Sequence, residues 1–225
     1  MLQNETKSSE QGLSASVQKH VDKLCARYPE LEVCRNDIVC GYKLMEQCYR
    51  SDGKLLLAGN GGSAADCEHI VGELMKRFKK PRPVHADLAQ RLKALDAERG
   101  TFLADKLEQG LMAISLTTHE ALTTAYCNDV DGKAVFAQQL FGYARPNDVF
   151  VGISTSGNSE NVLYAAILAK ALGMSVIGLT GRKGGELARI ADVCVKVPAD
   201  ETYQVQEFHL PVYHCWCMML EEMFF

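Results

Sequence analysis

Short apolar runs alternate with helical patterns through most of the chain, and this alternation constrains the fold more than any other feature. Five runs are apolar on both faces and rich in β-branched residues: 54–58, 111–116, 149–154, 176–180 and 193–197. Such runs are typical of buried parallel strands. Helical patterns separate them at 64–78, within 120–143 and at 161–172. The sequence therefore predicts an α/β fold built on a doubly wound parallel sheet.

The ends of the chain lie outside this alternation. Residues 1–13 are polar and without period, which predicts a disordered tail. Residues 14–52 hold two amphipathic helical patterns, the first capped by Ser14 and the second beginning at Pro29. We expect this helical pair to pack on the flank of the main domain, 53–225, and to serve oligomerisation.

Two later segments carry their own expectations. Residues 79–110 are longer than a crossover between two strands requires, so we interpret them as an insertion with one or two short helices that cover a site. The chain closes with a helical pattern over about 202–222. Pro211 falls inside it and is expected to kink the helix or to delay its start.

Charge and cysteine usage exclude several classes of protein. The chain has 225 residues and a formal net charge of −4, which argues against a nucleic-acid partner that needs a broad basic face. No stretch approaches the roughly 18 apolar residues of a membrane span, so we expect no membrane partner. Nine cysteines are scattered without a C-x-x-C pair or a leader segment, which favours a reducing cytoplasm.

Two loops suit an anion. GNGGS (59–63) follows the first apolar run, and the hydroxyl-rich STSGNS (154–159) follows the third. Glycines and a following helix N-terminus favour negative charge, although a plain turn is the alternative for either loop. Neither is a G-x-G-x-x-G or Walker loop, so no nucleotide cofactor is expected. With strand order 2-1-3-4-5, both loops would meet at the switch point of the sheet.

Ionisable side chains follow at helical spacing. His69 and Glu73 lie one turn apart on one helix face, where they can perform acid–base chemistry, hold a metal, or merely pair at the surface. Gln206 and His214 lie about two turns apart on the last helix and point broadly the same way. By itself, a histidine in an apolar stretch such as LPVYHCWCMML is as readily a core residue as a functional one.

Taken together, the motifs GNGGS, STSGNS, LTG-x-x-GG and QE-x-H resemble the sugar isomerase (SIS) domain family, most closely its sedoheptulose 7-phosphate (phosphoheptose) isomerases. The resemblance covers about residues 40–225 apart from the insertion. It implies a SIS domain with a flavodoxin-like five-stranded sheet, and a homotetramer with active sites between subunits. It also implies Glu73 and His214 as catalytic acid and base, and a zinc ion in some members. The implied zinc ligands are His69, Glu73, Gln206 and His214. The implied substrate-binding residues are Asn60, Gly61, Ser63, Arg77, Ser154, Thr155, Ser156, Ser159 and Gln206.

The activity implied by the resemblance is aldose–ketose isomerisation of a sugar phosphate. The expected reaction converts sedoheptulose 7-phosphate to D-glycero-D-manno-heptose 7-phosphate through an enediol. Two alternatives stay open at this point. One is a non-catalytic SIS protein, either an adaptor for a replication initiator or a phosphosugar sensor. The other is an isomerase of a different sugar phosphate.

Overall fold

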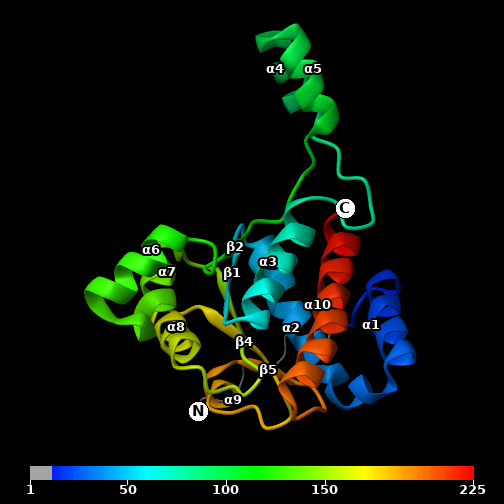
Figure 1. Ribbon diagram of the computed structural model, residues 1–225. Helices are drawn as coiled ribbons and strands as arrows, with labels where there is room; N and C mark the ends of the chain where they lie inside the picture. Colours follow the sequence, from blue (N-terminus) through cyan, green and yellow to red (C-terminus); the bar gives the residue numbers. More distant parts are fainter. Residues whose placement is uncertain (1–11) are drawn as a thin grey trace, which may run out of the picture.

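The computed structural model describes residues 12–225, so most of the predicted tail lies outside the described residues. Its centre is a five-stranded, all-parallel sheet with strand order β2-β1-β3-β4-β5 (Figure 1). The strands are β1 (Leu55–Gly59), β2 (Ala113–Ser115), β3 (Val149–Ile153), β4 (Ser175–Thr180) and β5 (Val193–Lys196). The predicted fold class and strand order are confirmed. β1 and β3 are neighbours in register from Leu55 with Val149 to Gly59 with Ile153.

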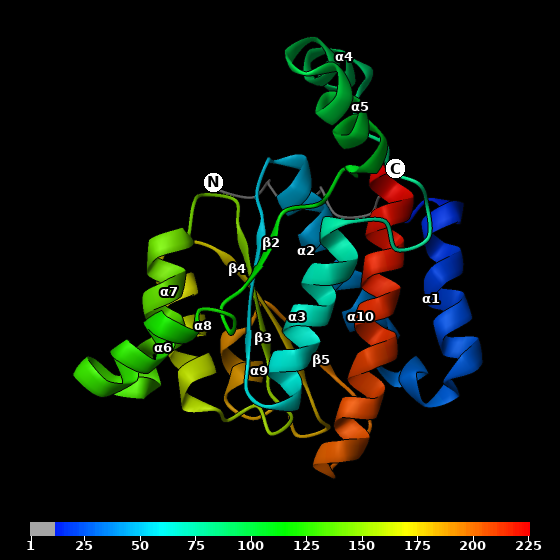
Figure 2. The ribbon, with the colours of Figure 1, turned by 45° about the horizontal axis from the view of Figure 1, so that its top comes forward.

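Helices cover both faces of the sheet (Figure 2). One face carries α1 (Ala15–Arg27), α2 (Arg35–Arg50), α3 (Gly62–Met75) and α10 (Thr202–Phe224). The other carries α6 (Glu120–Tyr126), α7 (Val135–Tyr143), α8 (Glu160–Ala171) and α9 (Leu187–Ile190). Successive strand residues face opposite layers, as the pleat requires: Leu55 and Leu57 join the first core, and Leu56 joins the second.

The N-terminal helical pair differs in one respect from the expectation. Ser14 caps α1 as predicted, its hydroxyl accepting a hydrogen bond from the Val17 N–H at 3.4 Å. The expected single helix from Pro29 is instead a 3₁₀-helix, Pro29–Cys34, followed by α2. The Cys34 backbone (φ −112°, ψ 12°) lies outside the α-helical range, which separates the two segments.

Helix α10 tests one of the two effects expected of Pro211, a delayed start of the helix. The helix begins at Thr202 and continues through Pro211 to Phe224, so the proline does not delay its start. Pro211 and the two residues that follow it are buried, and we attribute the tolerance of one lost backbone hydrogen bond to this packing. In residues 12–225, no helix is both long and apolar enough to span a membrane.

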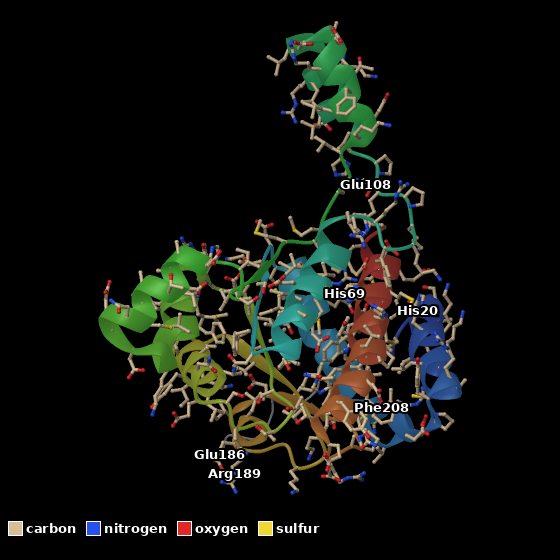
Figure 3. The ribbon with its side chains drawn as sticks, in the orientation of Figure 1. His20, His69, Glu108, Glu186, Arg189 and Phe208 are labelled. Carbon is tan, nitrogen blue, oxygen red and sulfur yellow. The ribbon has the colours of Figure 1, made fainter. Side chains whose placement is uncertain are left out.

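The insertion forms a helical hairpin, α4 (Ala86–Leu95) and α5 (Ala97–Lys106), that stands off the body (Figures 1 and 2). Its base is closed by an antiparallel bridge between Pro83 and Glu108. Figure 3 places Glu108 at one end of the body and Glu186, whose N–H donates to Asn158 of the STSGNS loop, at the other. The hairpin therefore does not cover the anion loops of its own chain, contrary to our expectation. Those loops follow the carboxyl ends of the strands, whereas the hairpin follows the far end of α3.

Candidate active site

The two predicted anion loops meet at the switch point between β1 and β3. The Asn60 side chain, in the loop after β1, and the Asn161 side chain, in the first turn of α8, exchange hydrogen bonds in both directions at 2.8 and 2.9 Å. Amide pairs of this kind fix the distance between the segments that carry them. The two loops thus lie side by side at the switch point, the place where ligands of open parallel sheets bind.

The hydroxyl-rich loop is held from behind by the loop after β4. Leu187 N–H donates to the Gly157 carbonyl at 2.9 Å, and Gly181 N–H donates to Thr155 at 3.0 Å. Gly157 has φ +70°, and a Cβ there would lie 2.0 Å from the Gly184 carbonyl oxygen, so only glycine fits. At the mouth of the loop, the Ser154 and Ser159 hydroxyls are 2.9 Å apart, while Ser156 is exposed.

The glycine loop passes the chain from β1 into α3 and contacts the start of α10. Asn60 and Gly61 are exposed, whereas Ser63 is buried. A Cβ on Gly62 would lie 2.3 Å from the Gln206 Nε2 atom, so Gln206 packs directly on this loop. Gln206 is therefore placed beside the expected position of the substrate chain.

His69, Glu73 and His214 form a row across the interface of α3 and α10, which lie side by side (Figures 2 and 3). The His69 Nε2 atom is 3.2 Å from Glu73 Oε1 and 3.4 Å from His214 Nε2. Of the two row residues on α3, Glu73 is the less exposed to solvent, with 14% of its side chain exposed against 42% for His69. The row lies about two helical turns beyond the glycine loop.

The electrostatics of the row favour a neutral imidazole at His214. Burial lowers the pKa of His214, the nearby His69 lowers it further, and Glu73 opposes both effects. Since burial and His69 outweigh Glu73, His214 is uncharged at neutral pH and can accept a proton. A carboxylate and a neutral imidazole in one row are an arrangement suited to moving protons.

The same row contains donors that zinc prefers, two imidazole nitrogens and one carboxylate. Within residues 12–225, however, no three His, Cys, Asp or Glu side chains already surround a common point as a metal requires. Instead, the His69 ring occupies the space between Glu73 and His214. Gln206, the fourth expected ligand, lies at the glycine loop, and its backbone is about two turns from that of His214 on α10.

Arg77 is not brought to the loops. Its side chain is 63% exposed, and its Nε is 2.9 Å from Glu108 Oε1 at the base of the hairpin. The backbone N–H of Arg77 also donates to the Glu108 carboxylate, at 3.0 Å. In a single chain Arg77 therefore holds the base of the insertion and does not contact the two anion loops.

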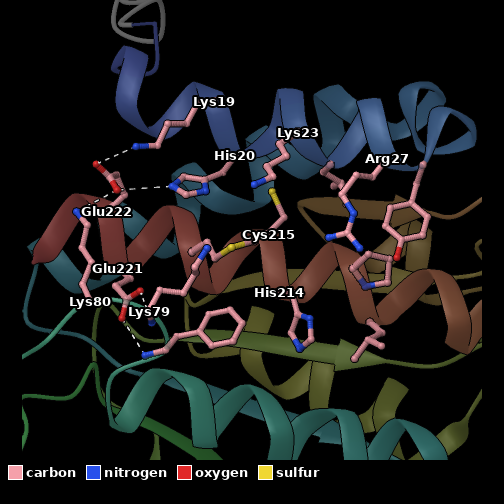
Figure 4. Close-up of a pocket in the computed structure, with 16 residues that line it drawn as sticks. Lys19, His20, Lys23, Arg27, Lys79, Lys80, His214, Cys215, Glu221 and Glu222 are labelled. Carbon is pink, nitrogen blue, oxygen red and sulfur yellow. Dashed lines mark hydrogen bonds and ion pairs between the residues drawn. The ribbon is translucent and has the colours of Figure 1, made fainter.

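A groove of about 840 Å³ opens beside His214, between α1 and α10 (Figure 4). Leu210 and Met218 give it an apolar lining, and basic side chains rim it: Lys19, His20, Lys23, Arg27, Lys79 and Lys80. Glu222 binds three of these groups, Lys19, His20 and Lys80. The serines of the hydroxyl-rich loop do not line this groove, so it meets the predicted site only at His214.

Two further groups of residues support the row, and the sequence reasoning missed both. In the first group, the Tyr213 hydroxyl contacts His69 directly, and Asp66 accepts a hydrogen bond from that hydroxyl. Arg82 and Glu221 join the end of α3 to α10 through an ion pair of 2.9 Å. The spacing of Asp66, His69 and Glu73 at three and four residues was a signal for the first group, because it puts all three on one helix face.

Comparisons with known proteins agree with this geometry. A model of the SIS domain matches residues 103–181. The phosphoheptose isomerase of Geotalea daltonii is 42% identical over 183 residues, covering 81% of this chain and 82% of the relative. That of Aneurinibacillus thermoaerophilus is 39% identical, covering 80% and 77%. The solved structure of phosphoheptose isomerase GmhA from Neisseria gonorrhoeae is 34% identical with a TM-score of 0.69, covering 91% of this chain and 96% of that one.

Proposed function

Because the chain belongs to the phosphoheptose isomerase family, we propose that it interconverts sedoheptulose 7-phosphate and D-glycero-D-manno-heptose 7-phosphate. The observation that carries this proposal is the row of His69, Glu73 and His214 on two helices that begin beside the paired anion loops. A phosphate cradle with acid–base groups beyond it is what isomerisation of an open-chain sugar phosphate requires.

The phosphate end of the substrate is assigned to the loop 154–159. Its hydroxyls and the N-terminus of α8 offer donors to an anion with no competing carboxylate from the loop itself. Asn60, Gly61, Ser63 and Gln206 would contact the sugar chain along the glycine loop. The role of Arg77 in this proposal is limited to anchoring the segment that follows α3.

Glu73 and His214 would share the proton transfers. One of them takes a proton from C1 of the open ketose, which leaves an enediol, and a proton is returned at C2. In the same cycle the C1 hydroxyl oxygen gives up its proton and the C2 oxygen gains one, so the aldose differs from the ketose only in proton positions. The neutral state of His214 suits it to accept the first proton.

A zinc ion fits the chemistry of this row and is part of the proposal. His69, Glu73 and His214 would hold it, with Gln206 as a fourth ligand from the glycine-loop end of α10. When bound, zinc would polarise the substrate carbonyl and stabilise negative charge on the enediol oxygens. The supporting observation is that His69 Nε2 faces both a carboxylate oxygen and a second imidazole nitrogen.

We further propose that four copies assemble and that the cytoplasm is the working compartment. The groove beside His214 supports assembly, since its apolar lining in a single chain is a surface that a second copy would cover. Light scattering should then give about 99 kDa, four times the 24.8 kDa of one chain. The nine unpaired thiols support a reducing compartment.

The activity is tested by incubating the protein with sedoheptulose 7-phosphate and following the aldose phosphate. Glu73→Gln and His214→Gln should each lower kcat by about 100-fold or more, the size of an acid–base contribution. Glu120→Gln, a change on the opposite face of the sheet, is the matched control and should leave kcat unchanged. Tight binding of the sugar phosphate without any turnover would instead favour a sensor or adaptor.

A further inference from the structure

We propose that Tyr213 and Asp66 fix the tautomer of His69, so that its Nδ1 carries the proton and its Nε2 lone pair faces Glu73 and His214. Both are positioning residues. Asp66 reaches the row only through Tyr213 and His69, and Tyr213 meets His214 by its ring alone, at 5.1 Å between centroids, while its hydroxyl faces His69 and Asp66. The catalytic consequence rests on the proposed function, whereas the position of the proton rests on the three side chains alone.

The three side chains form a chain of hydrogen bonds behind the row. The Tyr213 hydroxyl donates to Asp66 Oδ1 at 3.2 Å, and His69 Nδ1 lies 3.0 Å from the same hydroxyl oxygen. Tyr213 is 1% exposed, so no solvent competes at this position. Its ring meets the imidazole edge-on, with 5.4 Å between centroids.

Counting protons settles the direction of each bond. A tyrosine hydroxyl has one proton to donate, and an ionised carboxylate can only accept. Asp66 Oδ2 is buried without a hydrogen-bond partner among residues 12–225. If the hydroxyl donated to His69 instead, both Asp66 oxygens would lack a donor, at a cost of the order of 1–3 kcal/mol for each buried group. The hydroxyl proton therefore goes to Asp66, and the oxygen accepts from His69 Nδ1–H.

The arrangement determines what the other nitrogen can do. A neutral imidazole carries one N–H, so a proton on Nδ1 leaves Nε2 with a free lone pair. That nitrogen is the one near Glu73 Oε1 and His214 Nε2. In the opposite tautomer an Nε2–H would donate to Glu73 and occupy a carboxylate oxygen that the proton transfers need. Tyr213 and Asp66 thus keep the Nε2 lone pair of His69 available to a proton or a cation.

The chain supplies its own control. Tyr143 and His119 form a second tyrosine–histidine pair on the other face of the sheet, with the hydroxyl oxygen 3.1 Å from His119 Nε2. Tyrosine-to-phenylalanine changes at either position remove one oxygen and keep the ring. A general effect of losing a tyrosine hydroxyl bonded to histidine would therefore appear in both variants, and an effect on the row in only one.

The experiment records ¹⁵N chemical shifts of the histidine side chains in the full-length protein at pH 8.5 with EDTA, for wild type, Tyr213→Phe, Asp66→Asn and Tyr143→Phe. We expect His69 to be protonated on Nδ1 in wild type and in Tyr143→Phe, and to become a mixture of tautomers in Tyr213→Phe. In Asp66→Asn the new amide N–H₂ can donate to the tyrosine oxygen, so the hydroxyl turns to His69 and the proton moves to Nε2.

Kinetics provide the second measurement. Tyr213→Phe should lower kcat ten- to a hundredfold with little change in KM, because the substrate contacts remain. A wild-type His69 protonated on Nε2, or a tautomer that is unchanged in Tyr213→Phe, would overturn the proposal. Because the ¹⁵N shifts need no substrate, this result is independent of whether the protein turns over sedoheptulose 7-phosphate.

Discussion

The Arg82 guanidinium and the Glu221 carboxylate form an ion pair in the interior of the protein, with 0% and 3% of their side chains exposed. Arg82 also donates to the Leu74 carbonyl at 2.8 Å, which satisfies an unpaired group at the end of α3. Burial raises the pKa of Glu221, but the N–H groups of Phe78, Lys79 and Lys80 together with Arg82 outweigh it and hold the pKa below its usual range. The pair links the end of the helix that carries Glu73 to the helix that carries His214.

Removing one member of this pair should destabilise the protein strongly. Glu221→Leu leaves the guanidinium buried without its charge partner, and we expect a loss of about 3–5 kcal/mol in the free energy of unfolding. The double variant Glu221→Leu/Arg82→Met should lose less than the sum of the two single changes. Urea unfolding measures all three.

The control for the ion pair is Glu186→Gln, which removes a partner of Arg189 in an exposed pair of 2.8 Å. That change should cost no more than about 0.5 kcal/mol. Strict additivity of the two interior changes, within about 0.5 kcal/mol, would contradict the coupling that we describe.

Stability should depend on pH through His209, which is fully buried with neither ring nitrogen hydrogen-bonded within the described part of the chain. Burial lowers its pKa to about 4 from 6.5. Below pH 6.5 His209 therefore binds a proton in the unfolded chain but stays neutral in the folded protein. The stability that neutral His209 contributes is complete above pH 6.5 and is lost as the pH falls toward 4. We expect a loss of about 2 kcal/mol between pH 7 and pH 5.

The contribution of His209 is isolated by comparing wild type with His209→Met in urea at both pH values. The variant should lose about 2 kcal/mol less over this range, since methionine has nothing to protonate. Equal losses in the two proteins would show that other groups cause the dependence. His85→Met, at an exposed position, is the matched control and should behave as wild type.

The hairpin α4–α5 should be removable without unfolding the body. The Pro83–Glu108 bridge and the 2.7 Å hydrogen bond from Gln109 N–H to the Arg82 carbonyl hold its two ends together. Replacing residues 85–106 by a short Gly-Ser linker should preserve the circular dichroism of the body and its unfolding free energy to within about 1 kcal/mol. Failure of the shortened chain to fold would mean that the hairpin contributes to the core.

The hydroxyl-rich loop should determine binding rather than folding. Ser159→Ala removes a donor at the mouth of the loop, and a hydrogen bond to a charged phosphate is worth about 1.5–3 kcal/mol. We therefore expect KM for the sugar phosphate to rise about tenfold or more. Loss of the 2.9 Å contact with the Ser154 hydroxyl should lower the free energy of unfolding by only about 1 kcal/mol. Thr124→Ala, which removes a hydroxyl that bonds only within α6, should leave KM at the wild-type value. An unaltered KM in Ser159→Ala would place the phosphate elsewhere.

The sheet could be predicted from the sequence because its strands are short runs that are apolar on both faces and separated by helical patterns. The runs 54–58 and 149–154 each end at a polar loop. If these two loops bind one ligand, strands one and three must be neighbours, as they are in the order 2-1-3-4-5. The break at Cys34 could not be predicted, because the apolar period continues across it from Leu31 to Ile38. The extent of the last helix was predicted closely, since the pattern over about 202–222 matches α10, which continues through Pro211.

The row of His69, Glu73 and His214 was accessible from spacing and from family resemblance, whereas its surroundings were not. Nothing in the sequence placed Arg77 at the base of the hairpin, because its partner Glu108 lies 31 residues away. Likewise, Tyr213 looked like one more aromatic residue of an apolar helix. Its function depends on facing Asp66 across two helices, and only the packing of α3 on α10 determines that.

The central claim is that Glu73 and His214 move a proton between C1 and C2 of a ketose phosphate. The most direct test is to run the reaction of sedoheptulose 7-phosphate in D₂O and to measure deuterium at C2 of the aldose by NMR. We predict that wild type incorporates one deuterium at C2 and that Glu73→Gln, although folded and able to bind the sugar phosphate, does not. Product formed without deuterium at C2, or undiminished incorporation by Glu73→Gln, would contradict the account.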